Sequence, residues 1–267
     1  MLLGNKINIL GVHFSNLDEP ELVALLDDRI SKARKTQVCF VPTNSILAAR
    51  KSQFVMDVYN SADVVMCDGV PVLWASRLLG TPLKQRLTGF DFFPHFIAHC
   101  AQKNYSVYFL GSKEGVAKQL AAIYQSRYPG IRVAGYYTPP FAAAFSEEQN
   151  AVMRSAINAA KPDILFVSLT APKQDIWIHQ QLLQMNINLA IGIGAAFDSE
   201  AGSLKRAPIL MQKMGLEWFY RFLQEPGRMF RRYFIEAPIF VPLVMFQFFS
   251  TIFHRPNTEP HSNKYNR

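Results

Sequence analysis

The chain has 267 residues, of which 49% are hydrophobic, and a formal net charge of +8 at pH 7. This length and apolar content exclude a disordered chain and suffice for one large α/β domain or two small ones. The three cysteines, Cys39, Cys67 and Cys100, are odd in number and lack metal-type spacing, which argues against a disulfide framework and a cysteine zinc site. We interpret them as reduced residues of the core.

The first apolar run, MLLGNKINILGVHF, is short and is interrupted by polar residues. It is too short for a membrane span and lacks the form of a secretory signal. We therefore expect the protein to stay in the cytoplasm.

Seven short runs of apolar or β-branched residues punctuate the chain, and helical patterns follow the later ones. Runs that are apolar on both faces are typical of strands in a covered parallel sheet. We therefore predict an α/β fold, an open Rossmann-like and mostly parallel sheet covered by helices, whose ligands bind beyond the carboxyl ends of the strands. The runs are residues 7–12, 37–43, 63–69, 105–111, 131–137, 163–169 and 189–197.

Polar residues follow the second and third runs. Thr43 and Asn44 lie in the segment PTNS after the second run, and Asp68 follows the apolar part of the third. A carboxylate there is either a general base aimed at substrate or an N-cap for the next helix. The segment QRLTGFDFF then adds Arg86 and Asp91 in another apolar setting.

The segment YFLGSKEG places Gly111 between a strand and a helix. Backbone amides at such a helix start attract anions, which favours a diphosphate or nucleotide contact. A tight turn that needs glycine for its backbone geometry explains the same residue.

The segment LTAPKQD places Lys173, Gln174 and Asp175 directly before or within the start of a helix. From that position Lys173 and Gln174 could reach the same ligand. The alternative is a solvated helix start, with Asp175 near the positive end of the helix dipole.

The stretch AIGIGAAFDSEAGSLKRAP begins as a buried strand and contains Gly192, Gly194, Asp198 and Arg206. We interpret the glycines as allowing the backbone to approach a nucleotide, with Lys205 and Arg206 holding its anionic end or the loop itself. The stretch is neither a P-loop nor a complete dinucleotide fingerprint.

The histidines give little support for a metal site. His95 and His99 are four residues apart, but no further ligand spacing accompanies them, and no Asp-x-Asp pair is present. We expect neither a metal nor a cofactor, so a bound diphosphate would be stabilised by arginines and backbone amides.

The basic surplus is concentrated at the C-terminal end, where residues 201–267 hold ten Lys and Arg against four Glu. Bulky apolar neighbours favour an anionic membrane surface over nucleic acid. The apolar part, residues 239–253, is short and contains Pro242, so we expect it to lie on the membrane or to pack on the domain as ordinary amphipathic helices. We expect an α/β domain at 1–212, a helical appendage at 213–255, broken at Pro226 and Gly227, and a frayed tail at 256–267.

Taken in order, these segments resemble the WecG/TagA/CpsF family of bacterial glycosyltransferases. The match covers about residues 44–232. The motifs that carry it are DG at 68–69, R-x-x-G-x-D at 86–91, FLG at 109–111, PKQD-x-W at 172–177, G-x-G-x-x-x-D at 192–198, KRAP at 205–208 and GLEWFYRFLQEP at 215–226.

The resemblance implies a metal-independent, inverting transferase that moves a sugar from a UDP donor to a polyprenyl-diphosphate-linked sugar. Such enzymes work at the cytoplasmic membrane face and build envelope polysaccharides or teichoic acid linkage units. Asp68 would correspond to the catalytic base and the Asn44 strand end to a donor or acceptor contact. Arg221, Arg228 and Arg231 would belong to a C-terminal appendage that closes over the site and meets the diphosphate.

Three departures accompany the resemblance. The family often has Thr-x-Asn where this chain has Pro-Thr-Asn, so the role of Thr43 is shifted by one position. PKQD stands where PKQE is usual, and Ser112 where glycine is common.

Two other functions stay open from the residues alone, an NAD-dependent oxidoreductase and a non-catalytic nucleotide-binding membrane protein. The transferred sugar (N-acetylmannosamine, its uronic acid or glucose), the polymer and homo-oligomer formation are likewise left open.

Overall fold

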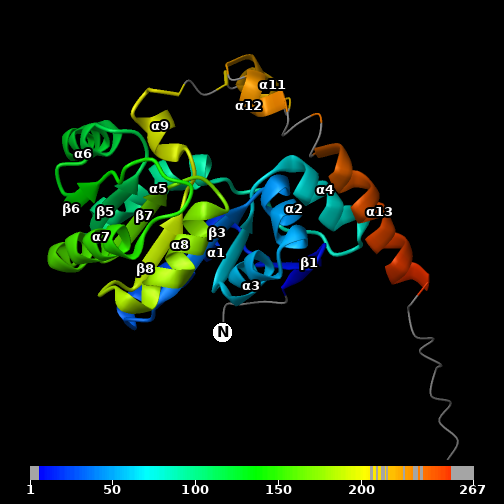
Figure 1. Cartoon of the computed structure of the whole chain (residues 1–267), viewed down its shortest axis with the longest axis horizontal. Helices are drawn as coiled ribbons and strands as arrows, with labels where there is room; N and C mark the ends of the chain where they lie inside the picture. Colours follow the sequence, from blue (N-terminus) through cyan, green and yellow to red (C-terminus); the bar gives the residue numbers. More distant parts are fainter. Residues whose placement is uncertain are drawn as a thin grey trace, which may run out of the picture.

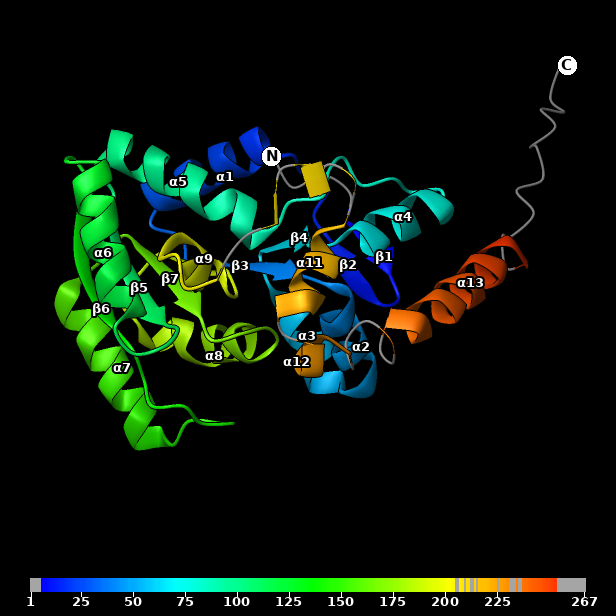
Figure 2. The same ribbon diagram turned by 90° about the horizontal axis from the view of Figure 1, so that it is seen from above.

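The computed structural model describes residues 6–204, 207–208, 210–211, 214, 216–224, 226–230, 234 and 237–253. It confirms the predicted α/β class, because six parallel strands form one sheet in the order β4-β3-β8-β7-β5-β6 with helices on both faces (Figures 1 and 2). The strands are β3 (Thr36–Val41), β4 (Val64–Cys67), β5 (Ser106–Gly111), β6 (Arg132–Tyr137), β7 (Ile164–Ser168) and β8 (Leu189–Gly192).

The helices form two layers, one on each face of the sheet. One face of the sheet is covered by α1 (Glu19–Ser31), α5 (Gly89–Lys103) and α6 (Val116–Arg127). The other is covered by α2 (Thr43–Lys51), α3 (Gln53–Ser61), α4 (Val70–Leu78), α7 (Glu147–Ala160), α8 (Lys173–Gln181) and the short 3-10 helix η1 (Leu182–Gln184).

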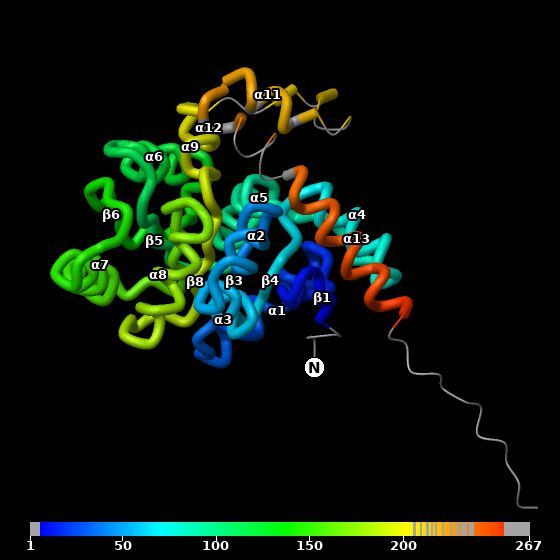
Figure 3. The backbone as a smooth tube through the Cα atoms, turned by 45° about the vertical axis from the view of Figure 1, so that its right-hand side comes forward, coloured from blue at the N-terminus to red at the C-terminus, as the bar shows by residue number. Residues whose placement is uncertain are grey.

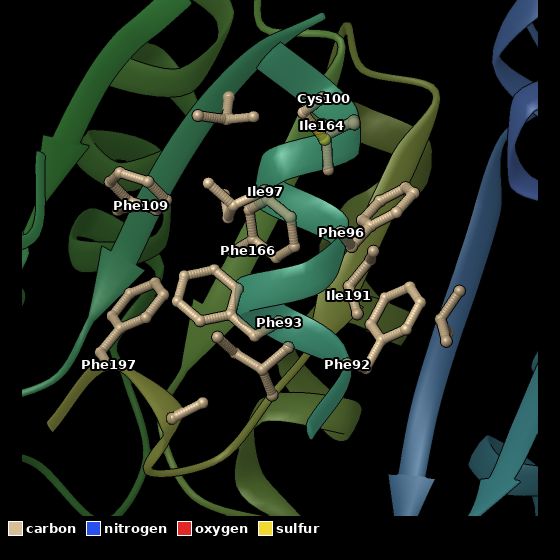
Figure 4. Close-up of a cluster of buried hydrophobic side chains, with 14 of the residues drawn as sticks. Phe92, Phe93, Phe96, Ile97, Cys100, Phe109, Ile164, Phe166, Ile191 and Phe197 are labelled. Carbon is tan, nitrogen blue, oxygen red and sulfur yellow. The ribbon is translucent and has the colours of Figure 1, made fainter. Parts of the chain in front are cut away.

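Period-two alternation along the strands divides the core between these layers. Figure 4 shows the first layer, where α5 turns Phe93 and Phe96 toward Phe109 of β5 and Phe166 of β7. The rings of Phe93 and Phe166 meet edge to face with centroids 4.9 Å apart, a geometry worth about 0.5–1.5 kcal/mol beyond area burial. All three cysteines are buried and free, which confirms their assignment to the core.

The first predicted strand is wrong as a member of the parallel sheet. Residues 7–12 divide at a turn into β1 (Ile7–Ile9) and the start of β2 (Val12–Phe14), which pair as a separate antiparallel hairpin. The reason is local, because Leu10 and Gly11 both have positive φ, at 53° and 93°, as a tight two-residue hairpin turn requires.

The C-terminal part contains α9 (Ala196–Glu200), α11 (Glu217–Gln224), α12 (Pro226–Phe230) and α13 (Ala237–Phe253). Helix α11 ends at Gln224, and α12 begins at Pro226 and includes Gly227. Residue 225 between them lies outside the described residues, so the predicted break stays a prediction. Figures 1 and 3 both show α11 and α12 on the same side of the molecule as α9, which follows β8. The expected tail at 256–267 lies outside the described residues.

Helix α13 is docked on the N-terminal hairpin. Phe240 and Val244 are buried in the same cluster as Ile9 of β1. Gln247 accepts the Leu10 N–H at 2.8 Å and donates to the Asn8 carbonyl at 3.1 Å. The rest of the helix exposes large apolar side chains, including Phe246, Phe249 and Phe253. Among the residues that the structure describes, no helix combines the length and apolar character needed to span a bilayer.

Candidate functional site

The carboxyl ends of neighbouring strands gather most of the predicted site residues on one side of the sheet, which we call the carboxyl edge. Parallel strands all end on the same side, so residues far apart in sequence become neighbours there. Asp68 follows β4, and Thr43 and Asn44 follow β3. Next in sheet order, β8 ends at Gly192 and leads to Gly194, β7 leads to Lys173 and Gln174 of α8, and β5 ends at Gly111 and leads to Ser112.

Asp68 is half-buried directly after β4, and its backbone N–H donates to the Val41 carbonyl at the end of β3, at 3.3 Å. The N-cap residue of α4 is Gly69, so the alternative interpretation of Asp68 as the N-cap is wrong. Burial and the nearby charge of Asp68 raise the pKa of the Cys67 thiol to about 12, while Arg86 acts in the opposite direction. A carboxylate and a guanidinium thus both act on the Cys67 thiol at this strand end.

Arg86 is oriented by the start of α5. Asp91 accepts from the Arg86 guanidinium at 3.3 Å and from the Thr88 hydroxyl at 2.8 Å, while Thr88 caps the helix by accepting the Asp91 N–H. The backbone of the next residue, Leu87, donates to the Cys67 carbonyl at 2.9 Å. These bonds hold the guanidinium near the end of β4, and Asp91 orients Arg86.

Gly111 is required by the neighbouring strand. A β-carbon at this position would lie 2.3 Å from the Ser168 carbonyl oxygen, and the φ of Gly111 is +108°. The turn interpretation therefore accounts for this glycine by itself. Ser112, also at positive φ, donates its hydroxyl to Asp198 of α9 at 3.1 Å and so joins two loops of the carboxyl edge.

Lys173 departs from its expected direction. Its ammonium donates to the Ala142 carbonyl and lies 3.8 Å from the centre of the Phe145 ring. Partial burial lowers its pKa. The side chain is thus docked on the segment after β6, whereas the adjacent Gln174 turns toward the end of β8.

Gln174 and Gly192 fit one another. Gln174 is buried, and its Oε1 accepts the Gly194 N–H at 3.0 Å. A β-carbon at Gly192 would stand 2.6 Å from Asp175 Oδ1 and 2.9 Å from Gln174 Nε2. Gly192 is therefore needed to admit side chains of α8. By contrast, a β-carbon at Gly194, whose φ is +61°, would meet no described atom within 4 Å.

Asp175 is completely buried, so the alternative of a solvated helix start is wrong for this residue. Its Oδ2 accepts from the Tyr59 hydroxyl at 3.1 Å, and its Oδ1 has no hydrogen-bond partner among the described residues. Burial raises the pKa of Asp175 to about 7, and Tyr59, Cys39 and Gln174 partly oppose that rise.

Asn44 also presents an unsatisfied polar atom. Thr43 and Asn44 are the first residues of α2, after the N-cap Pro42. The Asn44 Oδ1 is buried and finds no hydrogen-bond partner within the described part of the chain. Buried acceptors are normally paired, so this unpaired oxygen beside a strand end is an exception to the usual pattern.

The C-terminal arginines are only partly described. Arg206 and Arg231 lie outside the described residues, while the backbones of Arg221 and Arg228 belong to α11 and α12. His95 and His99 bond separately to Glu19 and Asp27 of α1 at 2.9 Å. No group of three or more His, Cys, Asp or Glu side chains among the described residues is arranged to hold a metal ion.

Three neighbours of these residues, Tyr59, Cys39 and Ser112, have contacts that no sequence pattern indicates. Tyr59 and Cys39 reach Asp175 from α3 and β3, and their positions fit ordinary buried faces of a helix and a strand. Ser112 stood out only as a departure from the usual glycine. Sequence spacing does not reveal its contact with Asp198, because the fold of the loop brings the Ser112 hydroxyl to that carboxylate.

A family model described as "Glycosyl transferase WecG/TagA/CpsF family" matches residues 7–252. A relative from Bacillus spizizenii, named N-acetylglucosaminyldiphosphoundecaprenol N-acetyl-beta-D-mannosaminyltransferase, is 34% identical over 188 residues, which are 70% of each chain. A protein of the same name from Staphylococcus aureus (strain MW2) is 28% identical over 238 residues, covering 88% of this chain and 91% of its own.

Proposed function

Because the chain belongs to the WecG/TagA/CpsF family of glycosyltransferases, we propose that it transfers a hexose from a UDP-sugar to a polyprenyl-diphosphate-linked sugar. The names of its relatives support an N-acetylmannosaminyl donor group and an N-acetylglucosaminyl lipid diphosphate as acceptor. A uronic acid or glucose donor is the alternative. The product would enter a cell-envelope polysaccharide or a teichoic acid.

The proposed reaction is a single displacement with Asp68 as the general base. The carboxylate takes the proton of the acceptor hydroxyl as that oxygen attacks the anomeric carbon of the donor. The bond from this carbon to the UDP oxygen breaks, so the configuration inverts. The observation that carries this role is the half-buried carboxylate of Asp68 at the carboxyl edge, beside Arg86 and outside the helix cap.

The negative charge that develops on the departing UDP is stabilised, in this proposal, by guanidinium groups and backbone amides. Arg86 would supply charge from the sheet, and Arg221 and Arg228 from α11 and α12, with Arg206 and Arg231 completing the set. Gly194 leaves open space at the end of β8, which suits close approach of a nucleotide. Asn44, which is half-buried at the start of α2, would contact the donor or the acceptor.

A product assay tests the reaction class. The protein is incubated with single UDP-sugars and a lipid-diphosphate N-acetylglucosamine acceptor, with and without EDTA, and the lipid is analysed by mass spectrometry. We expect one added hexose residue and an unchanged yield with EDTA. UDP binding without any product would favour a non-catalytic protein, tight NADH binding would favour an oxidoreductase, and loss of product with EDTA would contradict the metal-independent mechanism.

The protein would act peripherally at the cytoplasmic face of the plasma membrane, with its 213–255 segment contacting lipid. The exposed side of α13 supports this proposal, because Phe246 and Phe253 are 74% and 78% exposed while Phe240 and Val244 anchor the helix to the core. Helix α13 is apolar around its circumference and carries no charged side chain, so with one side anchored to the core it can place its other side in the headgroup region.

Replacing Phe246, Phe249 and Phe253 together with Ser should lower partition onto anionic liposomes roughly tenfold, because these rings would no longer leave water at the interface. Flotation with phosphatidylglycerol vesicles measures the effect. These substitutions leave Phe240, Val244 and Gln247 in place, which deletion of the helix would not. Phe141→Ser removes a fully exposed aromatic from the loop after β6 and is the matched control. Equal flotation of all three proteins would contradict the membrane role.

A further inference from the structure

A buried polar cluster lies beneath the centre of the carboxyl edge. It consists of Tyr59, Cys39, Gln174, Asp175 and Gly192, and we call it the Asp175 cluster. Its members come from α3, β3, α8 and β8, so it joins the neighbouring strands β3 and β8 to the helices that cover them. Asp175 has no exposed surface and therefore cannot touch a substrate.

Contacts on every side fix Asp175. The Gln37 side-chain amide donates to its backbone carbonyl at 2.8 Å, and the Tyr59 hydroxyl donates to Oδ2. Oδ1 faces the α-carbon of Gly192 so closely that a β-carbon there would stand 2.6 Å away. The carboxyl group is thus wedged between α3 and the last residue of β8.

Gln174 connects the Asp175 carboxyl group to the carboxyl edge. Its Nε2 lies beside Gly192, as Asp175 Oδ1 does, and a β-carbon at Gly192 would stand 2.9 Å from this nitrogen. Its Oε1 accepts the Gly194 N–H. The Ser168 hydroxyl donates to the Gly194 carbonyl at 2.6 Å and holds the turn from the side of β7. Asp175 and Gly192 limit where the Gln174 side-chain amide can lie, and this amide in turn holds the Gly194 peptide.

We propose that Asp175 is a positioning residue that holds the Gln174 side chain and the 192–194 turn in the geometry that sugar transfer requires. The proposal rests on the proposed function for its catalytic consequence. Its structural half, the control of the Gly194 peptide by Asp175, can be measured without any substrate.

The charge state of Asp175 adds a second expectation. The groups that act on it are Tyr59 from α3, Cys39 from β3 and Gln174 from its own helix, and all three are uncharged neighbours. Burial also raises the pKa values of Tyr59 and Cys39, so these two stay protonated in the neutral range. An ionised Asp175 accepts the Tyr59 hydroxyl at Oδ2, and a proton on that oxygen would remove this acceptor site. Transfer should therefore increase as the pH rises through about 7.

Hydrogen exchange of the Gly194 amide tests the structural half. In Asp175→Asn we expect this amide to exchange roughly tenfold faster than in the wild type, because its acceptor Gln174 is less firmly held. Amides of β5 should be unchanged. Asp163→Asn is the matched control, since Asp163 accepts from Ser106 at the opposite ends of β5 and β7. Wild-type exchange at Gly194 in Asp175→Asn, or equal acceleration in Asp163→Asn, would overturn the proposal.

The pH profile of kcat/KM tests the catalytic half. Asp175→Asn should lose the rise near neutral pH and transfer roughly tenfold more slowly on its alkaline side. Tyr59→Phe keeps the carboxyl group and removes one donor, so it should move the midpoint to higher pH, and it serves also if Asp175→Asn does not fold. An unchanged midpoint in Tyr59→Phe contradicts the proposal. Absence of transfer by the wild type would contradict the proposed function instead, while the exchange result would still decide the role of Asp175.

Discussion

Asp68→Asn should lower kcat for sugar transfer by roughly 10²–10⁴-fold, the usual contribution of a general base. Asn keeps the shape of the side chain but cannot take the acceptor proton. Substrate binding and stability should change little, because Gly69 rather than Asp68 is the N-cap residue of α4. Single-turnover kinetics with the UDP-sugar found in the product assay would separate the chemical step from binding.

A control for this substitution lies at the other end of β4. Asp63 precedes β4 at its amino end, where it accepts the Gln37 N–H at 3.0 Å and lies 3.7 Å from the Arg29 guanidinium. Asp63→Asn removes a carboxylate of the same type from the side of the sheet away from the carboxyl edge. Its kcat should stay within a few-fold of the wild type. Comparable losses in both variants, or turnover close to wild type in Asp68→Asn, would refute the assignment of Asp68 as the base.

Asp175→Asn should remove a large pH-dependent part of the free energy of unfolding. The pKa of this buried acid is raised from 3.8 to about 7 on folding, so the native state retains a proton that the unfolded state has lost. Wild-type stability therefore falls as the pH rises from about 4 to about 7, by about 4 kcal/mol in total. Asn resembles the protonated acid and carries no such titration.

Urea unfolding at pH 5, 6, 7 and 8 measures this difference. Relative to the wild type, Asp175→Asn should gain about 3 kcal/mol of stability between pH 5 and pH 8, whatever its absolute stability. Tyr59→Phe should extend the decline of stability to higher pH, because the Tyr59 hydrogen bond lowers the pKa of Asp175. A constant difference between Asp175→Asn and the wild type across this range would show that the carboxyl group does not titrate as the geometry requires.

Six of the seven predicted strands could be found from the sequence because parallel, fully covered strands are apolar on both faces. The same logic brought Asn44, Asp68, Gln174 and Gly194 to one side of the sheet, since strand ends of parallel sheets coincide. The separate hairpin of β1 and β2 could not be predicted, because its apolar pattern would be the same in the parallel sheet and in an antiparallel pair. Only the positive φ angles of Leu10 and Gly11 reveal the reversal.

Side-chain direction was less predictable than position. Lys173 and Gln174 are adjacent, yet one docks on Phe145 and the other on Gly194. Their partners come from different loops, and the helix rotation that separates them is decided by packing. Likewise, the position of Asp175 at a helix start is consistent with a solvated side chain. In the fold it is buried beside Tyr59, which lies 116 residues earlier in the sequence.

The attachment of α13 to the N-terminal hairpin has a consequence for biosynthesis. Gln247 binds Leu10 across 237 residues of sequence, and Phe240 and Val244 complete the apolar layer around the hairpin. On the ribosome, β1 and β2 are made before the helix that covers them, and the whole parallel sheet lies between them in the sequence. The layer around the hairpin can therefore close only after all six strands of that sheet have been made.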